Sequence, residues 1–408
     1  MDNSKKYIWE NKRFGVKTLS PLHIGDSESW QKDFDYIFDT KSRTAFFIDY
    51  DDFLSQMDTD FLRETDDAES FRNAMFDLFK QRKLKILQKY SLAHEVSNIY
   101  PFVRENFSPL IPGSSIKGAL RTAVLTAIIR KKLEKGETVS TSPEDYLKKV
   151  VGKKRDNIKQ SMDTIHIRDL HIEVDNLSLF QFRSYSLHKN AFVEKTDKVR
   201  VVEAIPADTH LKYNLDVRLA YRESDKESFK GVEELLDLST TLRDHYRLWI
   251  KQECDFLKNY PSPEIDPVID FYESLLKKLD NGSILLNMGY GTGWEGKTGT
   301  FLKNNRYMWE RSILDYLKSC RRDSEKRSHR FTRILNDWRY LKCPQGHAKV
   351  SVSRYDDSKV YCRDCRKDYV LDDLNIVYPY PKSRKFVFSQ RTLLPPGWLE
   401  ISPLNAEG

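Results

Sequence analysis

The stretch Phe107-Ser-Pro-Leu-Ile-Pro-Gly-Ser-Ser-Ile-Lys-Gly-Ala-Leu-Arg121 contains the change from an extended segment to a long helix that decides the fold of this chain. Pro109 and Pro112 exclude a helix before Gly113, because proline lacks a main-chain donor and clashes with the preceding turn. After Gly113, apolar residues recur at helical spacing: Ile116, Leu120, Ala123, Val124, Ala127 and Ile128. The sequence therefore predicts a loop that turns into a helix here.

The first turns of this helix have the features of an anion site. Ser114 or Ser115 is the expected N-cap, and Gly118 lacks a side chain where a ligand could approach the backbone. Lys117 and Arg121 are four residues apart and share one face. Unpaired amides at a positive helix end, together with two cations, favour anion binding. The alternative is a Ser-capped surface helix whose two cations are only solvated.

The segment Ile111-Pro-Gly-Ser-Ser-Ile-Lys-Gly-Ala-Leu-Arg121 resembles the glycine-rich loop of the RAMP superfamily, the RNA-binding subunits of CRISPR effector complexes. The resemblance implies RRM-like (ferredoxin-like) domains whose loops hold the backbone of a guide RNA. Residues 112–121 would then be the first such loop. Its expected RNA contacts are Gly113, Ser114, Ser115, Lys117, Gly118 and Arg121.

Composition is that of a globular chain with a charged surface. At 408 residues it is long enough for two or three domains, with 39% hydrophobic and 32% charged residues. No apolar run approaches the length of a membrane span, and Met1–Tyr7 leads into no apolar segment of a secretory signal. We therefore expect a cytoplasmic protein with no membrane partner.

The net charge of +7 suits a polyanion partner, and the charge is unevenly distributed. Asp49–Glu69 holds nine acids and one Arg, whereas Arg321–Lys342 holds eight basic residues and three acids. The second stretch is a candidate phosphate-facing surface. Solvated helix faces would explain both stretches equally well.

A second segment of the same resemblance is Ser20-Pro-Leu-His-Ile-Gly25, which follows a predicted strand over Arg13–Leu19. In the superfamily it leads from the first strand towards the RNA, which makes His23 and Gly25 expected RNA contacts. Related RNA-processing enzymes use such a histidine as a general acid or base. No second acid or base stands near His23 in the motif, and this favours a hydrogen-bonding loop residue.

Ile165-His-Ile-Arg-Asp169 fits an Ile-x-Ile-x-Asp segment of the superfamily and adds Arg168 to the RNA-binding candidates. His166, Arg168 and His171 could face one side of this strand, either towards RNA or as ordinary surface residues. Other expected strands are Phe34–Phe38, Thr44–Ile48, Thr164–Val174, Leu177–Leu187, Val201–Ile205 and His210–Leu219. Expected helical segments are Phe71–Tyr90, Val232–Leu257 and Pro267–Leu279, with a polar insertion over Thr138–Lys159.

A second glycine-rich loop, Gly289-Tyr-Gly-Thr-Gly-Trp-Glu-Gly-Lys-Thr-Gly299, follows a predicted strand over Ser283–Met288. Gly291–Thr298 matches the P-loop pattern G-x-x-x-x-G-K-T. Gly299 would fall in the first helical turn, and no apolar strand ending in Asp follows to hold magnesium, so an ATPase is disfavoured. The resemblance implies an RNA-binding loop instead, with amides on phosphate and Trp294 stacked on a base. Its expected contacts are Gly289, Gly291, Gly293, Trp294 and Lys297.

Three of the five cysteines lie close together with one histidine. Cys343 and His347 form one pair, and Cys362 and Cys365 form another after 14 intervening residues. Two such pairs around a β-ribbon have the layout of a zinc ribbon with Cys₃His ligation. The closed ligand set predicts a structural Zn²⁺, and unligated thiols are the alternative.

The chain ends with Arg384–Phe388 and then Leu394-Pro-Pro-Gly-Trp-Leu399. This ending resembles one RAMP subtype, the Csm-complex subunit of type III-A CRISPR systems that caps the helical backbone at the crRNA 3′ end. The prediction is an α+β chain of two RRM-like RAMP domains, at 1–195 and 196–408. The second would carry a helical block at 230–280, the glycine-rich loop at 289–299 and the zinc-ribbon-like insertion at 341–368.

The predicted function is a non-catalytic subunit that binds crRNA and other Csm subunits. A nuclease that trims the RNA 3′ end is a further partner to test. The rival hypothesis is a metal-independent crRNA-processing endoribonuclease of the same superfamily that uses His23.

Overall fold

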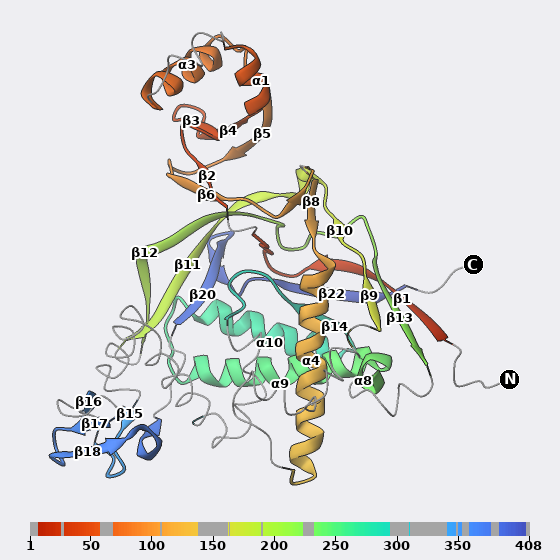
Figure 1. Cartoon of the computed structure of the whole chain (residues 1–408), viewed down its shortest axis with the longest axis vertical. Helices are drawn as coiled ribbons and strands as arrows, with labels where there is room; N and C mark the ends of the chain where they lie inside the picture. Colours follow the sequence, from red (N-terminus) through yellow and green to blue (C-terminus); the bar gives the residue numbers. More distant parts are fainter. Residues whose placement is uncertain are drawn as a thin grey trace.

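The computed structural model describes residues 7–25, 28–57, 68–106, 108–137, 162, 164–188, 191–222, 232–293, 310, 341–347, 350–352, 359–376 and 383–404. Within these residues the strands form six sheets. Figure 1 shows a central body of sheets and helices, with a small lobe at one end and a separate ribbon at the other. The expected α+β class is confirmed, and the number of RRM-like domains stays a prediction.

A five-stranded antiparallel sheet joins the two ends of the chain. Its order is β14 (Ile284–Asn287), β22 (Trp398–Pro403), β1 (Tyr7–Thr18), β13 (Leu215–Arg222) and β9 (Ile165–Ile167). Side chains alternate along β1: Phe14 and Val16 are buried, whereas Trp9 is 65% exposed on the other face. One face of this sheet therefore belongs to the core.

Four of the described helices cover the core side. They are α4 (Gly113–Glu134), α8 (Val232–Leu236), α9 (Leu238–Lys258) and α10 (Asp266–Asp280). The predicted helical block is confirmed, with a break where the Asp237 carboxylate caps α9 by accepting from Thr240 N. On α9, the Trp249 ring stacks on Trp398 of β22 with centroids 4.9 Å apart. Burial of these rings fixes the helices to the sheet.

A six-stranded sheet forms the second wall of the body. Its order is β2 (Trp30–Gln31), β6 (Asn98–Tyr100), β12 (Ala191–Ala204), β11 (Ser178–His188), β20 (Ser383–Ser389) and β21 (Thr392–Leu394). One face joins the main core through Tyr185 and Phe386. The other carries a second cluster of Phe182, Val202, Ala204 and Val387. The expected domain boundary at 195/196 falls inside β12, and the division into two domains stays a prediction.

The small lobe at the top of Figure 1 has its own hydrophobic cluster. It contains β3 (Tyr36–Asp39), β4 (Thr44–Ile48), α1 (Tyr50–Ser55), α3 (Ala68–Lys80) and β5 (Ile86–Ser91). The predicted hairpin is confirmed, but the single helix expected over Phe71–Tyr90 is wrong. The helix ends at Lys80, and Arg82 turns the chain with a φ of 56°. Pairing of β5 with β4 then overrides the local helical preference.

Three small sheets remain among the described residues. β7 (Arg104–Glu105), β8 (Ser108–Ile111) and β10 (Leu170–His171) lead into α4. The Cys-rich ribbon contains β16 (Val350–Val352), β17 (Lys359–Cys362) and β18 (Lys367–Val370), next to the pair β15 (Leu341–Lys342) and β19 (Asn375–Ile376). The predicted insertion at 138–159 and the basic segment at 321–340 lie outside the described residues. No helix among the described residues is long and apolar enough to cross a membrane.

Candidate nucleic-acid interface

The predicted change from loop to helix is confirmed, but α4 begins at Gly113, earlier than a cap at Ser114 or Ser115 would allow. Pro112 is the N-cap in an extended conformation and provides no side-chain hydrogen bond. Its main-chain carbonyl accepts from Ser115 N at 2.9 Å and from Ile116 N at 3.3 Å. The prediction that Ser114 or Ser115 caps the helix is therefore wrong, because both serines already lie inside the first turn.

Gly113 is buried, and its main-chain N–H is already used. It donates to Oδ1 of Asp169, 2.7 Å away. A Cβ on Gly113 would clash with the main-chain oxygen of Ile167 at the end of β9. The positive helix end therefore holds the protein's own carboxylate. Gly113 thus serves close packing of α4 on β9, and the RNA contact expected there stays a prediction.

The two cations expected to act together on α4 differ in their surroundings. Lys117 Nζ donates to the main-chain oxygen of Ile165, 3.1 Å away, so this side chain bridges α4 and β9. Arg121 is exposed, as are Gly118 and Ser114, about one and two turns before it. A Cβ on Gly118 would meet no atom within 4 Å. Arg168, at the end of β9, is also exposed. This side of the molecule offers Arg121 and Arg168 to a ligand.

His23 lies in an enclosed site with 4% of its surface exposed. Its Nδ1 is 2.7 Å from the main-chain oxygen of Glu203, to which a protonated Nδ1 donates. The rings of Phe102, Phe182 and Tyr290 surround it in edge-on contacts, with centroids 5.9 to 6.3 Å away. A Cβ on the exposed Gly25 would lie 2.9 Å from His23 Nε2. These contacts bury His23 in the fold, and its expected RNA contact stays a prediction.

A buried ion pair supports the histidine site. Arg104 donates to both oxygens of the fully buried Glu203 carboxylate, at 2.6 and 2.7 Å. The same carboxylate accepts from Phe102 N at 2.7 Å and from the Tyr90 hydroxyl. Burial, together with the negative charge of Glu203, raises the pKa of Tyr90. With four donors, the carboxylate is well compensated and fixes Phe102 beside His23.

The second glycine-rich loop is built directly on the histidine segment. Tyr290 N donates to the main-chain oxygen of His23 at 2.8 Å. Gly289, Gly291 and Gly293 have φ values of 88°, 92° and 75°, which favour glycine. A Cβ on Gly289 would clash with the His23 carbonyl, and one on Gly291 would lie 2.7 Å from Pro396. Two segments predicted to bind RNA from opposite ends of the chain therefore meet here.

The outer end of this loop is open. Gly293 is exposed, and a Cβ there would meet no atom of the described residues within 4 Å. Trp294 and Lys297, expected to stack on a base and to bind phosphate, lie outside the described residues.

Two cations near the loop were missed by the sequence reasoning. Lys385 Nζ lies 3.9 Å from the centroid of the Tyr290 ring, and Arg200 Cζ lies 5.6 Å from it. Arg200 Cζ is also 4.9 Å from the centroid of Tyr100. We call these four residues the tyrosine–cation cluster. Its only sequence signal is the tyrosine within the glycine-rich loop, because the other members are distant along the chain.

The Cys-rich ribbon brings the four predicted ligands together. The ligand atoms of Cys343, His347, Cys362 and Cys365 all lie within 4.8 Å of one another. His347 Nδ1 is 3.0 Å from Cys365 Sγ and 3.5 Å from Cys343 Sγ, which is 3.7 Å from Cys365 Sγ. Ligands bound tetrahedrally at about 2.0 to 2.3 Å from one zinc ion have similar separations. The cluster could therefore hold a metal ion.

The comparison with family models decides where the protein belongs. Residues 16–295, which contain both described glycine-bearing segments, match the model of the RAMP superfamily. The chain belongs to the RAMP superfamily. No curated protein sequence matches it.

Among solved structures, this RAMP protein resembles a chain in the cryo-EM structure of a Csm–crRNA–target RNA ternary complex of a type III-A CRISPR-Cas system. The TM-score is 0.57 with 17% sequence identity, over 96% of this chain and 100% of that chain. The crystal structure of T. onnurineus Csm5 aligns with a TM-score of 0.48 and 17% identity, over 73% of this chain and 96% of that one. The first of these similarities shows that the fold extends beyond the matched family region.

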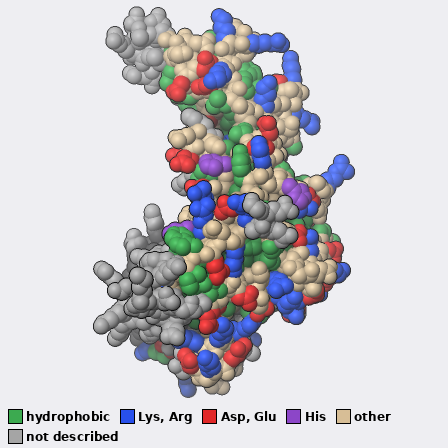
Figure 2. Space-filling model, turned by 90° about the vertical axis from the view of Figure 1, so that its right-hand side faces the viewer, with side chains coloured by type: hydrophobic (Ala, Val, Ile, Leu, Met, Phe, Trp, Pro, Cys, Tyr) green, Lys and Arg blue, Asp and Glu red, His purple; other side chains and the backbone are tan. Residues whose placement is uncertain are grey.

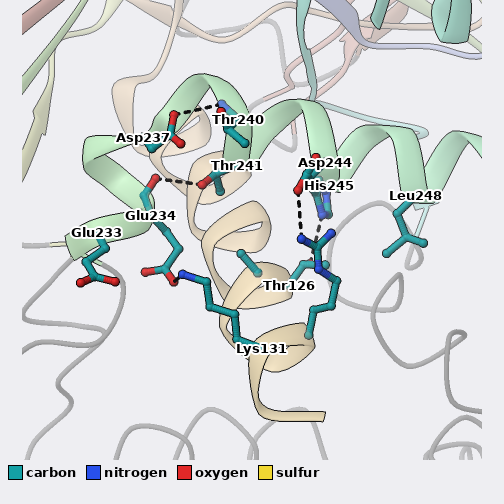
Figure 3. A pocket seen from close by; sticks show the side chains of 12 residues that line it. Thr126, Lys131, Glu233, Glu234, Asp237, Thr240, Thr241, Asp244, His245 and Leu248 are labelled. Carbon is teal, nitrogen blue, oxygen red and sulfur yellow. Dashed lines mark hydrogen bonds and ion pairs between the residues drawn. The ribbon is translucent and has the colours of Figure 1, made fainter. Parts of the chain in front are cut away.

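The pocket in Figure 3 is a separate feature of this RAMP protein. It lies between α4, α8 and α9 and has a volume of about 320 Å³. Its charged groups are largely paired within the pocket: Lys131 with Glu234 at 2.8 Å, and Arg130 with Asp244 at 3.0 Å. On the face shown in Figure 2, Lys and Arg are interspersed with Asp and Glu.

Proposed function

We propose that the protein is a non-catalytic crRNA-binding subunit of a type III-A Csm complex, where it holds the 3′ part of the crRNA and caps the backbone filament. Membership of the RAMP superfamily and the fold shared with a chain of a Csm–crRNA–target RNA complex support this proposal. The observation that carries it is the loop at Gly289–Gly293, which rests on the His23 segment, is open at Gly293 and lies beside Arg200 and Lys385.

Such a surface reads the RNA backbone more than the bases. Main-chain amides and cations bind phosphates and 2′-hydroxyls, which are the same at every nucleotide. Sequence selection would come from pairing between the crRNA and its target. The proposal includes two RRM-like domains, a cytoplasmic location, other Csm subunits as partners, and a 3′-trimming nuclease as a candidate partner.

Co-purification tests the proposal most simply. The tagged protein would be isolated from its host, and the bound proteins and RNA identified by mass spectrometry and RNA sequencing. We expect the other Csm subunits and crRNA, with altered crRNA 3′ ends when this subunit is deleted. Complexes of unchanged length and unchanged crRNA ends in the deletion strain would contradict the capping role.

The surroundings of His23 oppose the endoribonuclease alternative. A general acid or base must reach the reacting group, whereas His23 is enclosed by three aromatic rings and bound through Nδ1. The test is incubation of the purified protein with labelled repeat RNA in EDTA. We expect no discrete products. Products that disappear in His23→Gln, with the fold intact by circular dichroism, would support the nuclease.

We also propose that Cys343, His347, Cys362 and Cys365 hold a structural Zn²⁺. When bound, zinc would cross-link the two ends of the ribbon. Metal analysis should find about one zinc ion per chain, lost in Cys362→Ser/Cys365→Ser. The matched control is Cys254→Ser, because Cys254 is buried in α9 away from the ribbon. Equal zinc content in all three proteins would contradict this site.

A further inference from the structure

The tyrosine–cation cluster projects from one face of the six-stranded sheet. In the sheet register, Arg200 of β12 is opposite Phe182 of β11, and Lys385 of β20 is opposite Ser184 of β11. Residues 182 and 184 are two apart on one strand, so their side chains share a face. Arg200 and Lys385 therefore flank β11 on the same side of the sheet.

The base of this cluster is rigid and apolar. Phe182, Val202, Ala204 and Val387 are almost fully buried beneath it. The partly buried Tyr100 and Tyr290 pack against that layer. The cations are thus held over a fixed surface, and the ordering of side chains on binding costs less than it would on a mobile loop.

No acid in the described part of the chain pairs with either of the two cations. Among the described residues, neither Arg200 nor Lys385 forms an ion pair with a carboxylate, and their contacts are to tyrosine rings. The two tyrosines differ. Tyr290 contacts both cations as well as Phe182 and His23, whereas the only described cation against Tyr100 is Arg200. Among the described residues, Tyr290 therefore has more ring and cation neighbours than Tyr100, which makes Tyr100 the better candidate for stacking a planar ligand.

We propose that this cluster binds one unpaired nucleotide of single-stranded RNA, with its phosphate at Arg200 and Lys385 and its base stacked on Tyr100. The inference rests on the proposed function and specifies a site for it. Cations over a sheet with an aromatic platform are the combination that binds single strands without base preference. An acidic protein segment would use the cations but would gain nothing from a stacking platform.

The experiment measures binding of a single-stranded oligoribonucleotide that carries one fluorescent 2-aminopurine, at several salt concentrations. In Arg200→Gln/Lys385→Gln we expect affinity to fall about tenfold or more, and the salt dependence to weaken by about 0.7 in log–log slope for each lost phosphate contact. The matched control is Arg82→Gln/Lys83→Gln, which removes the same charge from two exposed residues of the small lobe. This control should change neither quantity by more than about twofold.

A second pair of variants tests the stacking. Tyr100→Leu should reduce affinity by about 5- to 100-fold and leave the salt slope unchanged, whereas Tyr100→Phe should bind like the wild type. An abasic nucleotide at the stacked position should weaken the wild type and have no further effect on Tyr100→Leu. The Phe variant keeps the packing of the ring, so it separates stacking from loss of structure.

The results separate this inference from the proposed function. If the wild type binds RNA and Arg200→Gln/Lys385→Gln binds it with the same affinity and the same salt dependence, the site is overturned and the proposed function stands. If the wild-type protein binds no RNA, either alone or in its assembled complex, both the site and the proposed function are overturned. Loss of assembly with other subunits, at unchanged RNA affinity, would identify an acidic protein partner and also overturn the site.

Discussion

The start of α4 and the loop at Gly289–Gly293 both contain glycines in a sequence typical of RNA-binding loops, but the structure uses them differently. At Gly113 the N–H binds Asp169, and the missing side chain makes room for β9. In the second loop, Gly289 and Gly291 pack closely and Gly293 faces open space. The start of α4 already binds a carboxylate of the protein, whereas the second loop leaves its outer end and the nearby cations accessible.

The difference shows that a glycine-rich motif has separable roles. Glycine is favoured both where another part of the protein packs closely against the backbone and where a ligand does. The structure distinguishes them by what a Cβ would meet and by whether the nearby cations are paired. By both criteria, we expect the second loop to contribute more to RNA binding than the start of α4.

The largest expected effect is on stability, when alanine replaces each of two glycines in α4. Gly113→Ala should destabilise the fold by about 3 kcal/mol, because the new Cβ clashes with the Ile167 carbonyl. Gly118→Ala is the matched control and should stabilise by up to about 1 kcal/mol, since the position is exposed and helical. Urea unfolding of both variants checks this. Equal stabilities would remove the structural role assigned to Gly113.

A second prediction tests how firmly α4 is held by its neighbour α9. His245 Nδ1 lies 3.0 Å from Thr126 Oγ1 of α4, and burial lowers the pKa of His245 to about 3 from 6.5. Between these values the unfolded chain binds the extra proton, so stability is complete above pH 6.5 and falls on acidification. The loss is about 1.4 kcal/mol per pH unit, or about 2 kcal/mol at pH 5.

The measurement is urea unfolding of wild type and His245→Asn between pH 7.5 and pH 5. The variant keeps a donor near Thr126 but has no proton to gain, so its stability should fall less steeply with acid. Parallel pH profiles for the two proteins would contradict the assignment.

The next largest effect on stability should follow removal of the Asp169 carboxylate at the start of α4. Asp169→Ala leaves the Gly113 N–H without its charged acceptor and should cost about 1 to 2 kcal/mol in the free energy of unfolding. Asp169→Asn keeps an acceptor oxygen and should cost less. If Asp169→Ala were as stable as the wild type, the helix end would not depend on this carboxylate.

The smallest effect should be on RNA affinity when cations near α4 are removed. Arg121→Gln/Arg168→Gln should weaken crRNA binding by no more than about threefold, compared with about tenfold or more for Arg200→Gln/Lys385→Gln. Filter binding at two salt concentrations compares the pairs at equal loss of charge. The reverse order of effects would make α4 the main contact and invert the comparison.

Much of the fold could be predicted because it depends on local pattern. The start of α4, the hairpin of β3 and β4, the helical block and the Cys₃His cluster each follow from residues close together in sequence. The second half of Phe71–Tyr90 could not, because β5 exists only through its pairing with β4. Local preference loses to tertiary pairing in such segments.

The candidate site shows the same limit. His23 and the loop at Gly289–Gly293 could be selected from sequence, but their direct contact could not. The partner of Gly113 is an acid 56 residues away. Arg200 and Lys385 lie on strands that meet only through the sheet register. Long-range pairing of this kind leaves no periodic signal in the sequence.

Photo-cross-linking of crRNA in the assembled complex tests the central claim most directly. The crRNA would carry 4-thiouridine at successive positions of its 3′ part, and the cross-linked peptides would be identified by mass spectrometry. We predict cross-links to peptides that contain Tyr100 or Tyr290, with intact RNA. Cross-links confined to Gly113–Arg121 or to the face around Trp9, with none at Tyr100 or Tyr290, would contradict the account.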